Sequence, residues 1–295
     1  MNILTLVASE RLSPGDVSAA SDALRAAGAE PGPGRWLDGG IAYDIDFSGL
    51  SLKSARSVID ALGLHFADFF VQPAAYRRKK LLVADMDSTM ITVECIDELA
   101  DYAGLKPEIA AVTEAAMRGE LDFAGALDAR VALLKGLPAH AIDRCYDERV
   151  RLMAGARTLV HTLRAHGART VLVSGGFTVF ADRVGEAIGF DRVIANVLLI
   201  EDGALTGAVA KPIVDSETKL TMLRSEATAA GLNLAETLAI GDGANDIPMI
   251  EAAGLGVAYH AKPKTEAAAD AAVRHGNLTA VLYALGLPRR EWLSA

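Results

Sequence analysis

The stretch LLVADMDSTM, residues 81–90, decides how the rest of the chain is interpreted. It begins with an apolar run, Leu81 to Ala84, typical of a strand that is buried on both faces of a parallel sheet. Two carboxylates, Asp85 and Asp87, follow at once. An isolated Asp-x-Asp is more often a pair of turn or capping residues. Directly after a buried strand, however, the pair costs desolvation free energy that a turn does not require, so it indicates a functional site.

Two other apolar runs end in polar, glycine-containing segments: TVLV before SGG (174–176) and TLAI before GDGAND (241–246). In open α/β sheets, ligands bind beyond the carboxyl ends of the strands, so we expect all three segments at one edge. Asp85, Asp87 and Asp242 would repel one another there unless a cation lay among them, and oxygen ligands favour Mg²⁺. The SGG segment before a helix fits an anion site, or equally a simple strand-to-helix turn.

Alternating strands and helices predict an α/β protein with a Rossmann-like, mostly parallel sheet covered by helices on both faces. Residues 95–152 show helical periodicity and form a predicted helical cap inserted after the first strand of that sheet. Asp202-Gly203 between two apolar runs predicts a β-hairpin. We therefore assign residues 76–295 to this domain.

Residues 1–75 form a predicted small N-terminal α/β domain of ferredoxin-like order. Their strands and helices resemble an ACT-type amino-acid-binding regulatory unit in topology only. The Gly/Pro-rich stretch EPGPGRWLDGG (30–40) is expected to be a loop. ACT-like units often pair, so a homodimer stays open.

Composition excludes several classes of protein. The net charge is -9, and the one dense basic run, YRRKK (76–80), fits a solvated linker, so we expect no nucleic-acid partner. The two cysteines do not make a disulfide framework, and no apolar stretch approaches the ~20 residues of a membrane span. The N-terminus lacks the features of a signal peptide. We expect a cytoplasmic protein without a membrane partner.

Several motifs together resemble those of the haloacid dehalogenase-like phosphatases: DMDST (85–89), SGGF (174–177), a lysine at 219 and GDGAND (241–246), in that order. Two further stretches resemble more specifically the phosphoserine phosphatase family: VECIDELA (93–100) and FAGALDARVALLKGLP (123–138). The resemblance covers about residues 80 to 275.

The resemblance implies a Mg²⁺-dependent phosphatase in which Asp85 is the nucleophile that accepts the phosphoryl group. Asp87 would protonate the leaving oxygen and then activate water, and the crowd of neighbouring carboxylates would tend to raise its pKa. The metal ligands would be the Asp85 carboxylate, the Asp87 backbone carbonyl and Asp242.

The same resemblance places the phosphoryl oxygens on Ser174, the Gly175 N–H and Lys219. Asn245 would line the site and Asp246 would support it. By itself Lys219 fits an ordinary surface lysine, and only the resemblance gives it a role.

Glu94 and Arg130 would bind the α-ammonium and α-carboxylate of O-phospho-L-serine, since a guanidinium holds a carboxylate through two hydrogen bonds. Judged from spacing alone, both fit solvent-facing helix charges. Phe123 lies two helical turns before Arg130 and would shield the site when the cap closes.

The expected activity is hydrolysis of O-phospho-L-serine to L-serine and phosphate, the last step of serine biosynthesis. A phosphotransferase, or a phosphatase acting on another small phosphorylated metabolite, stays open. A non-catalytic amino-acid sensor stays open as well, although the intact Asp85, Asp87, Lys219 and Asp242 argue against it.

Overall fold

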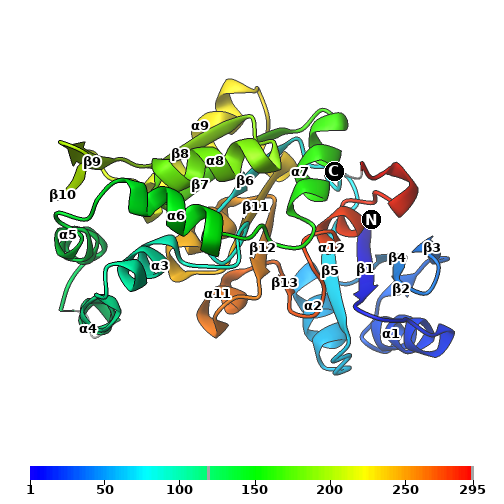
Figure 1. Ribbon diagram of the computed structural model, residues 1–295. Helices are drawn as coiled ribbons and strands as arrows, with labels where there is room; N and C mark the ends of the chain where they lie inside the picture. Colours follow the sequence, from blue (N-terminus) through cyan, green and yellow to red (C-terminus); the bar gives the residue numbers. More distant parts are fainter. Residues whose placement is uncertain (118–119, 294–295) are drawn as a thin grey trace.

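The computed structural model describes residues 1–117 and 120–293 (Figure 1). A five-stranded sheet forms near the N-terminus and a six-stranded sheet forms from the rest of the chain, together with a two-stranded hairpin. Figure 1 shows the N-terminal unit at the right, beside the larger sheet. Two residues of the predicted cap, Arg118 and Gly119, lie outside the described residues.

The N-terminal sheet is antiparallel in all its pairings, with strand order β2-β4-β1-β5 and with β3 also paired to β4. Its elements are β1 (Asn2–Ala8), α1 (Pro14–Ala26), β2 (Glu30–Pro31), β3 (Arg35–Asp38), β4 (Ala42–Ser48), α2 (Leu52–Asp60) and β5 (Ala67–Pro73). This is the ferredoxin-like order with one extra strand. The ACT-like character of the unit stays a prediction.

The prediction of a loop over residues 30–40 is wrong in part, because both β2 and β3 pair with β4. Pro31 has no N–H to donate, which an edge strand tolerates. These strands are 2 and 4 residues long, too short for an apolar pattern to reveal them.

Both faces of the N-terminal sheet are covered. On one face, Leu6 packs against Leu24 of α1 and Ile59 of α2. On the other face, Val7 and Phe70 belong to the core of the larger unit. The two units therefore bury apolar surface against each other.

The predicted solvated linker YRRKK is buried at two of its residues, which corrects that expectation. Arg77 is 9% exposed and donates two hydrogen bonds, of 2.7 and 2.8 Å, to the Asp44 carboxylate. Lys79 is 6% exposed and donates to the carbonyls of Ala235 and Gly254, and burial lowers its pKa to about 8. Arg77 thus binds the N-terminal unit and Lys79 binds the larger unit, so these hydrogen bonds fix the linker to both units.

The larger sheet is parallel throughout, with strand order β13-β12-β11-β6-β7-β8. Its strands are β6 (Leu81–Ala84), β7 (Arg169–Phe177), β8 (Arg192–Asn196), β11 (Thr237–Gly241), β12 (Leu255–Tyr259) and β13 (Ala271–Val273). Because β11, β6 and β7 are neighbours, the polar segments at their carboxyl ends meet at one edge, as predicted.

Helices cover both faces of this sheet, also as predicted. Leu82 packs in the core with α7 and α8, whereas its neighbours Leu81 and Val83 pack with α9 and α10. The helices outside the cap are α7 (Ala156–Ala165), α8 (Thr178–Ile188), α9 (Ser216–Ala229), η1 (Leu234–Glu236), η2 (Ala244–Asp246), α10 (Ile247–Ala252), α11 (Pro263–Ala268), α12 (Ala280–Ala284) and η3 (Arg289–Glu291).

β7 extends through the SGG segment, so these residues do not open a helix as expected. The register to β8 shifts between Val173 and Phe177, and α8 begins only at Thr178. The two glycines lie in this irregular strand end, where they let the backbone approach a ligand closely.

The cap follows β6 and comprises α3 (Cys95–Tyr102), α4 (Lys106–Met117), α5 (Phe123–Leu133) and α6 (His140–Arg149). The predicted hairpin is confirmed as β9 (Leu198–Glu201) and β10 (Ala204–Val209). Its turn residues Asp202 and Gly203 have φ of 49° and 76°, which fits a two-residue hairpin turn. The segment after β10 reaches the cap, because Lys211 binds both carboxylate oxygens of Asp128 on α5 at 2.9 Å.

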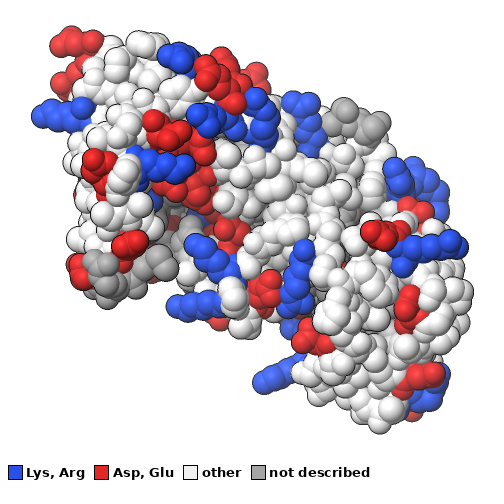
Figure 2. Space-filling view, turned by 60° about the horizontal axis from the view of Figure 1, so that its bottom comes forward, with Lys and Arg blue, Asp and Glu red and all other residues white. Residues whose placement is uncertain are grey.

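Charged side chains are mixed on the surface. On the face drawn in Figure 2, Lys and Arg lie among Asp and Glu without forming a continuous basic stripe, in keeping with the net charge of -9. Within residues 1–117 and 120–293, no helix combines the length and the apolar composition that crossing a membrane requires.

Candidate active site

A cavity of about 380 Å³ lies at the carboxyl ends of β6, β7 and β11, beneath the cap. Its lining includes eight of the nine site residues predicted from the sequence: Asp85, Asp87, Glu94, Arg130, Ser174, Gly175, Asp242 and Asn245. The ninth, Lys219, is fully buried against Asp85. The structure therefore brings all of the predicted residues together.

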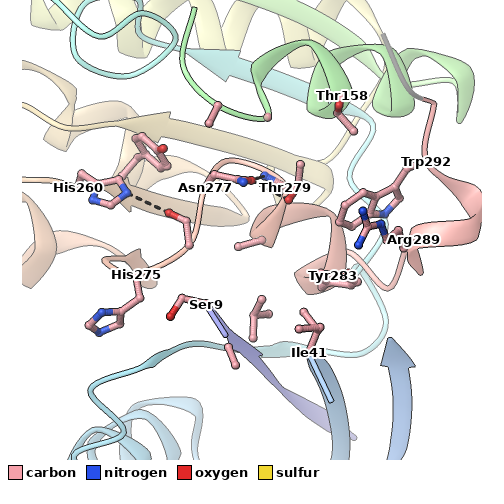
Figure 3. A pocket seen from close by; sticks show the side chains of 17 residues that line it. Ser9, Ile41, Thr158, His260, His275, Asn277, Thr279, Tyr283, Arg289 and Trp292 are labelled. Carbon is pink, nitrogen blue, oxygen red and sulfur yellow. Dashed lines mark hydrogen bonds between the residues drawn. The ribbon is translucent and has the colours of Figure 1, made fainter. Parts of the chain in front are cut away.

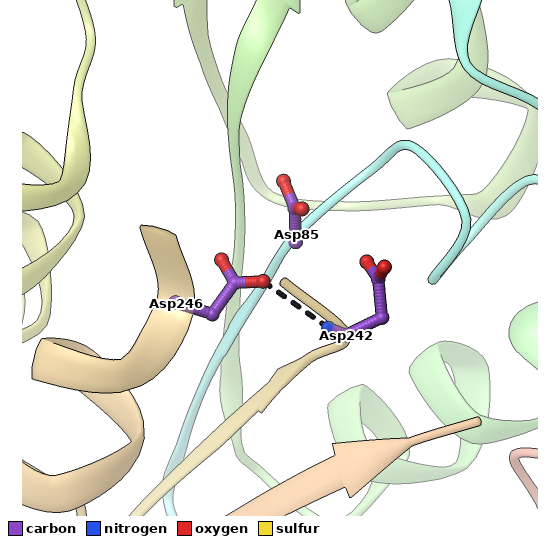
Figure 4. A group of neighbouring side chains, drawn as sticks. All are labelled: Asp85, Asp242 and Asp246. Atoms are coloured by element: carbon purple, nitrogen blue, oxygen red, sulfur yellow. Dashed lines mark hydrogen bonds between the residues drawn. The ribbon is translucent and has the colours of Figure 1, made fainter. Parts of the chain in front are cut away.

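Three carboxylates form a cluster at this edge (Figure 4). Asp85, Asp242 and Asp246 each place one oxygen within 4.8 Å of the others. The pairing of β6 with β11 positions Asp85, whose N–H donates to the Ile240 carbonyl at 3.0 Å. The side chain of Asp87 is not part of the cluster.

Lys219 lies directly between two of these carboxylates. Its Nζ is 2.6 Å from Asp85 Oδ1 and 2.6 Å from Asp246 Oδ1. Burial favours loss of the proton, but the two carboxylates outweigh it and raise the pKa of Lys219. Lys219 is thus a buried ammonium group, and the surface-lysine alternative is wrong.

Asp246 uses both of its carboxylate oxygens within the protein. Oδ1 binds Lys219, and Oδ2 accepts the backbone N–H groups of Asp242 and Gly243 at 3.1 and 3.0 Å. A Cβ at Gly241 would lie 2.3 Å from Asp246 Cγ, so only glycine fits there. Asp246 therefore fixes the GDGAND segment.

Asp85 and Asp242 each keep one oxygen for the cavity. Lys219 binds Oδ1 of Asp85, and the Thr89 hydroxyl donates to Oδ1 of Asp242 at 3.1 Å. Burial, followed by repulsion from Asp246, raises the pKa of both carboxyls, that of Asp242 to about 6. When ionised, three carboxylates and one ammonium leave two excess negative charges, which one divalent cation would balance.

Asp87 lies on the cap side of the cavity. The Cys95 N–H is 3.4 Å from its Oδ1, and a Cβ at Gly176 would lie 3.0 Å from its Oδ2. Burial, followed by repulsion from Glu94, raises its pKa to about 7. The sequence interpretation attributed this shift to neighbouring carboxylates, whereas burial is the larger cause. A carboxyl group of this pKa both donates and accepts protons near neutral pH.

A network behind the cavity holds the SGG segment. The Ser174 hydroxyl accepts the Gly176 N–H at 2.9 Å, so its own proton can point to a ligand. Asn196 donates to the Gly175 carbonyl at 2.9 Å and accepts the Val214 N–H at 2.7 Å. Sequence reasoning missed Asn196. It also did not predict strand β8, so nothing in the sequence marked the last residue of that strand, Asn196.

The cap supplies opposite charges to the cavity. Glu94 precedes α3 and accepts a hydrogen bond from the Ser88 hydroxyl at 2.9 Å. Arg130 on α5 uses Nε to bond the Ala126 carbonyl at 3.2 Å, which leaves its two terminal nitrogens for a ligand. One carboxylate and one guanidinium therefore line the same cavity.

Two further contacts complete the enclosure. A Cβ at Gly175 would lie 3.2 Å from the ring of Phe123, so this cap residue covers the SGG segment. Lys262, which the sequence did not single out, also lines the cavity, and its N–H donates to the Asp242 carbonyl at 3.3 Å.

Comparison with known proteins finds a matching family model and several related sequences. The model of the haloacid dehalogenase-like hydrolase family matches residues 82–251. Phosphoserine phosphatase of Streptomyces coelicolor is 48% identical over 255 residues, which are 85% of this chain and 62% of that protein. Phosphoserine phosphatase SerB2 of Mycobacterium tuberculosis is 49% identical over 217 residues, which are 74% of this chain and 53% of that protein. The chain thus spans less than two thirds of either relative.

A solved structure extends the match to the N-terminal unit. The probable phosphoserine phosphatase of Vibrio cholerae, in unliganded form, superimposes with a TM-score of 0.77 at 34% identity. The superposition covers 98% of this chain and 88% of the other. The family match spans more than half of the 295 residues and contains all nine site residues predicted from the sequence. The chain belongs to the haloacid dehalogenase-like hydrolase family.

Proposed function

We propose that this protein is a Mg²⁺-dependent phosphoserine phosphatase, which hydrolyses O-phospho-L-serine to L-serine and phosphate. One observation carries the proposal. The cavity that holds the buried Asp85–Lys219 pair also receives a carboxylate, Glu94, and a guanidinium, Arg130, from the cap. This pair complements the ammonium and carboxylate of an amino acid. The names of the relatives point to the same activity.

The residues at the sheet edge fit a magnesium ion. Asp85 and Asp242 would hold it through one carboxylate oxygen each, together with the Asp87 carbonyl. When bound, the ion neutralises negative charge on the phosphoryl group and the nucleophile. Asp246 would not be a ligand, because both of its oxygens are already bonded.

Asp85 is the nucleophile in this proposal. Lys219 restrains its Oδ1, and Oδ2 forms the bond to phosphorus as the bond to the serine oxygen breaks. Asp87 donates its proton to that leaving oxygen. It then takes a proton from the water that attacks the aspartyl-phosphate, which a pKa of about 7 permits.

The phosphoryl oxygens would lie against the SGG segment. We assign the Ser174 hydroxyl and the Gly175 N–H as donors, with Asn245 beside them. Lys219 adds a buried positive charge below the group. Such pre-organised donors stabilise charge in the transition state without having to reorient.

We also assign residues 1–75 to an ACT-like unit and residues 76–295 to the phosphatase unit. Separate apolar clusters support this division: one lies between the N-terminal sheet and its own helices, and the others lie on the two faces of the parallel sheet.

Glu94 and Arg130 provide the test of substrate identity. Glu94→Gln and Arg130→Ala are each expected to lower kcat/KM for O-phospho-L-serine about 10- to 100-fold, the effect of losing a charge-assisted hydrogen bond. Hydrolysis of p-nitrophenyl phosphate, which has no amino-acid end, should change much less. Arg144→Ala, on cap helix α6 and outside the cavity, is the matched control. Equal losses on both substrates would refute the assignment.

Mg²⁺ is expected to stabilise the protein more at pH 8 than at pH 5. Asp85, Asp87 and Asp242 have raised pKa values, so the metal-free folded protein binds more protons than the unfolded chain does. Its free energy of unfolding therefore falls as pH rises from about 4, the unfolded aspartate pKa, to about 7. Since Mg²⁺ competes with these protons, it should raise Tm by about 5 °C or more at pH 8.

Thermal unfolding with EDTA or with excess Mg²⁺ measures this effect. Asp242→Asn removes one proposed ligand and should shrink the shift at pH 8. A shift of the same size at both pH values, or an unchanged shift in Asp242→Asn, would contradict the assigned metal site.

A further inference from the structure

A second cavity, larger than the catalytic one, lies between the N-terminal unit and the C-terminal part of the chain. Its volume is about 970 Å³, at the upper end of the range for small-molecule sites. Figure 3 shows Ser9 and Ile41 of the N-terminal unit on one side, and Thr158 of α7 on the other. Nothing in the proposed catalytic cycle uses this cavity.

The charge of the lining favours an anion. The lining contains Arg289, His260 and His275 and no aspartate or glutamate, although the chain as a whole carries a charge of -9. Among residues 1–117 and 120–293, Arg289 has no ion-pair partner. A concave surface with only basic charges attracts anions.

The polar groups along the cavity are held in place. His260 has a left-handed backbone, with φ of 43°, and its Nε2 donates to the Gly276 carbonyl at 3.0 Å, which leaves Nδ1 for a ligand. Asn277 Oδ1 accepts both the N–H and the hydroxyl of Thr279, at 2.9 and 2.7 Å. The Asn277 amide NH₂ is then left as a donor.

The segment that carries these groups is fixed from the N-terminal unit. Asp68, 2% exposed, accepts the backbone N–H groups of Arg274, His275 and Gly276 at 2.8 to 3.1 Å. A site whose groups are already ordered loses little conformational entropy when a ligand binds.

One end of the cavity is aromatic. The rings of Tyr283 and Trp292 lie 4.7 Å apart, and Figure 3 shows Arg289 beside them. Their polar atoms are already bonded, Tyr283 to Asp38 and Trp292 to the Leu287 carbonyl. The rings therefore offer apolar surface next to a single guanidinium, which matches one carboxylate through two hydrogen bonds.

We propose that this cavity binds a small organic monocarboxylate with an aromatic or apolar body. Its carboxylate binds Arg289 and its body lies against Trp292, while His260 and Asn277 serve polar substituents at the other end. The site differs from the catalytic cavity in position and in charge.

The chain offers a direct readout because it contains two tryptophans. Trp36→Phe, at a 41% exposed residue of β3, leaves Trp292 as the single tryptophan, which is excited selectively at wavelengths where tyrosine does not absorb. This variant of the 295-residue chain is titrated in Mg²⁺ buffer with 3-phenylpropionate and, separately, with its neutral amide, 3-phenylpropionamide. We expect saturable quenching of Trp292 by the carboxylate, with the amide binding at least tenfold more weakly.

Arg289→Met should weaken the carboxylate at least tenfold, whereas Arg290→Met, an adjacent exposed arginine outside the cavity, should change Kd less than twofold. Calorimetry on the chain with both tryptophans gives a second measure of Kd. If Arg289→Met fails to fold, the proposal is tested by comparing the Kd of the carboxylate with that of the amide on the protein with Arg289 intact. Absence of saturable binding, equal Kd for acid and amide, or equal effects of the two arginine variants would each overturn the proposal.

Discussion

Asp85→Asn is expected to lower kcat for O-phospho-L-serine by about four orders of magnitude or more, the scale of removing a catalytic nucleophile. An amide is a very poor nucleophile toward phosphorus, and the proposed route has no other group at this position. The variant should fold, since asparagine can still accept from Lys219 and removes one of the buried carboxylates that repel one another.

Phosphate release under saturating Mg²⁺ measures this loss, and thermal unfolding checks the fold. Asp128→Asn is the matched control and should retain full activity. Asp128 lies on the cap, is 51% exposed and forms an ion pair with Lys211. Activity of Asp85→Asn within tenfold of the parent would refute covalent catalysis by Asp85.

Lys219→Met is expected to destabilise the metal-free protein by about 3–5 kcal/mol at pH 8, the effect of removing one partner from a buried ion pair. Both Asp85 and Asp246 would then be left buried without their shared counter-charge. The loss should shrink at pH 5, because protonation of the remaining carboxylates relieves the repulsion.

Urea unfolding in EDTA at both pH values measures the difference. Lys211→Met removes a lysine whose ion pair with Asp128 is more than half exposed, and such pairs contribute about 0–1 kcal/mol. If Lys219→Met were no more destabilising than Lys211→Met at pH 8, the buried charge cluster would not be what holds this edge of the sheet together.

The sheet and the catalytic edge could be predicted because their signals are local. A strand buried on both faces is an unbroken apolar run, and a parallel sheet brings the carboxyl ends of its strands to one edge. The segments after Ala84, Val173 and Ile240 therefore had to lie close together if the runs were strands. The hairpin with Asp202 and Gly203 at its turn could also be predicted from the sequence, because a two-residue hairpin turn accepts few residue types.

Features that depend on distant contacts could not be predicted. Arg77 is buried only because Asp44, far away in the sequence, meets it across the boundary of the two units. Asn196 has a role only through its bonds to Gly175 and Val214 on other segments. In the same way, Lys219 resembles any surface lysine until the fold places two carboxylates around it.

The boundary between the units shows this limit most clearly. The second cavity takes residues from several separate stretches of the chain, none of which carries a recognisable pattern. The catalytic site is built from strand ends that have strong sequence signals. This cavity instead forms where the N-terminal unit packs against the larger unit. Cavities of this kind are found only once tertiary structure is known.

Phosphate release from a panel of small phosphomonoesters tests the central claim most directly. Purified protein with Mg²⁺ is predicted to hydrolyse O-phospho-L-serine with a kcat/KM at least about tenfold above that of O-phospho-ethanolamine, which lacks the carboxylate that Arg130 would bind. Chelation of the metal should abolish the reaction. No phosphate from O-phospho-L-serine, or equal use of both compounds, would contradict the proposed function.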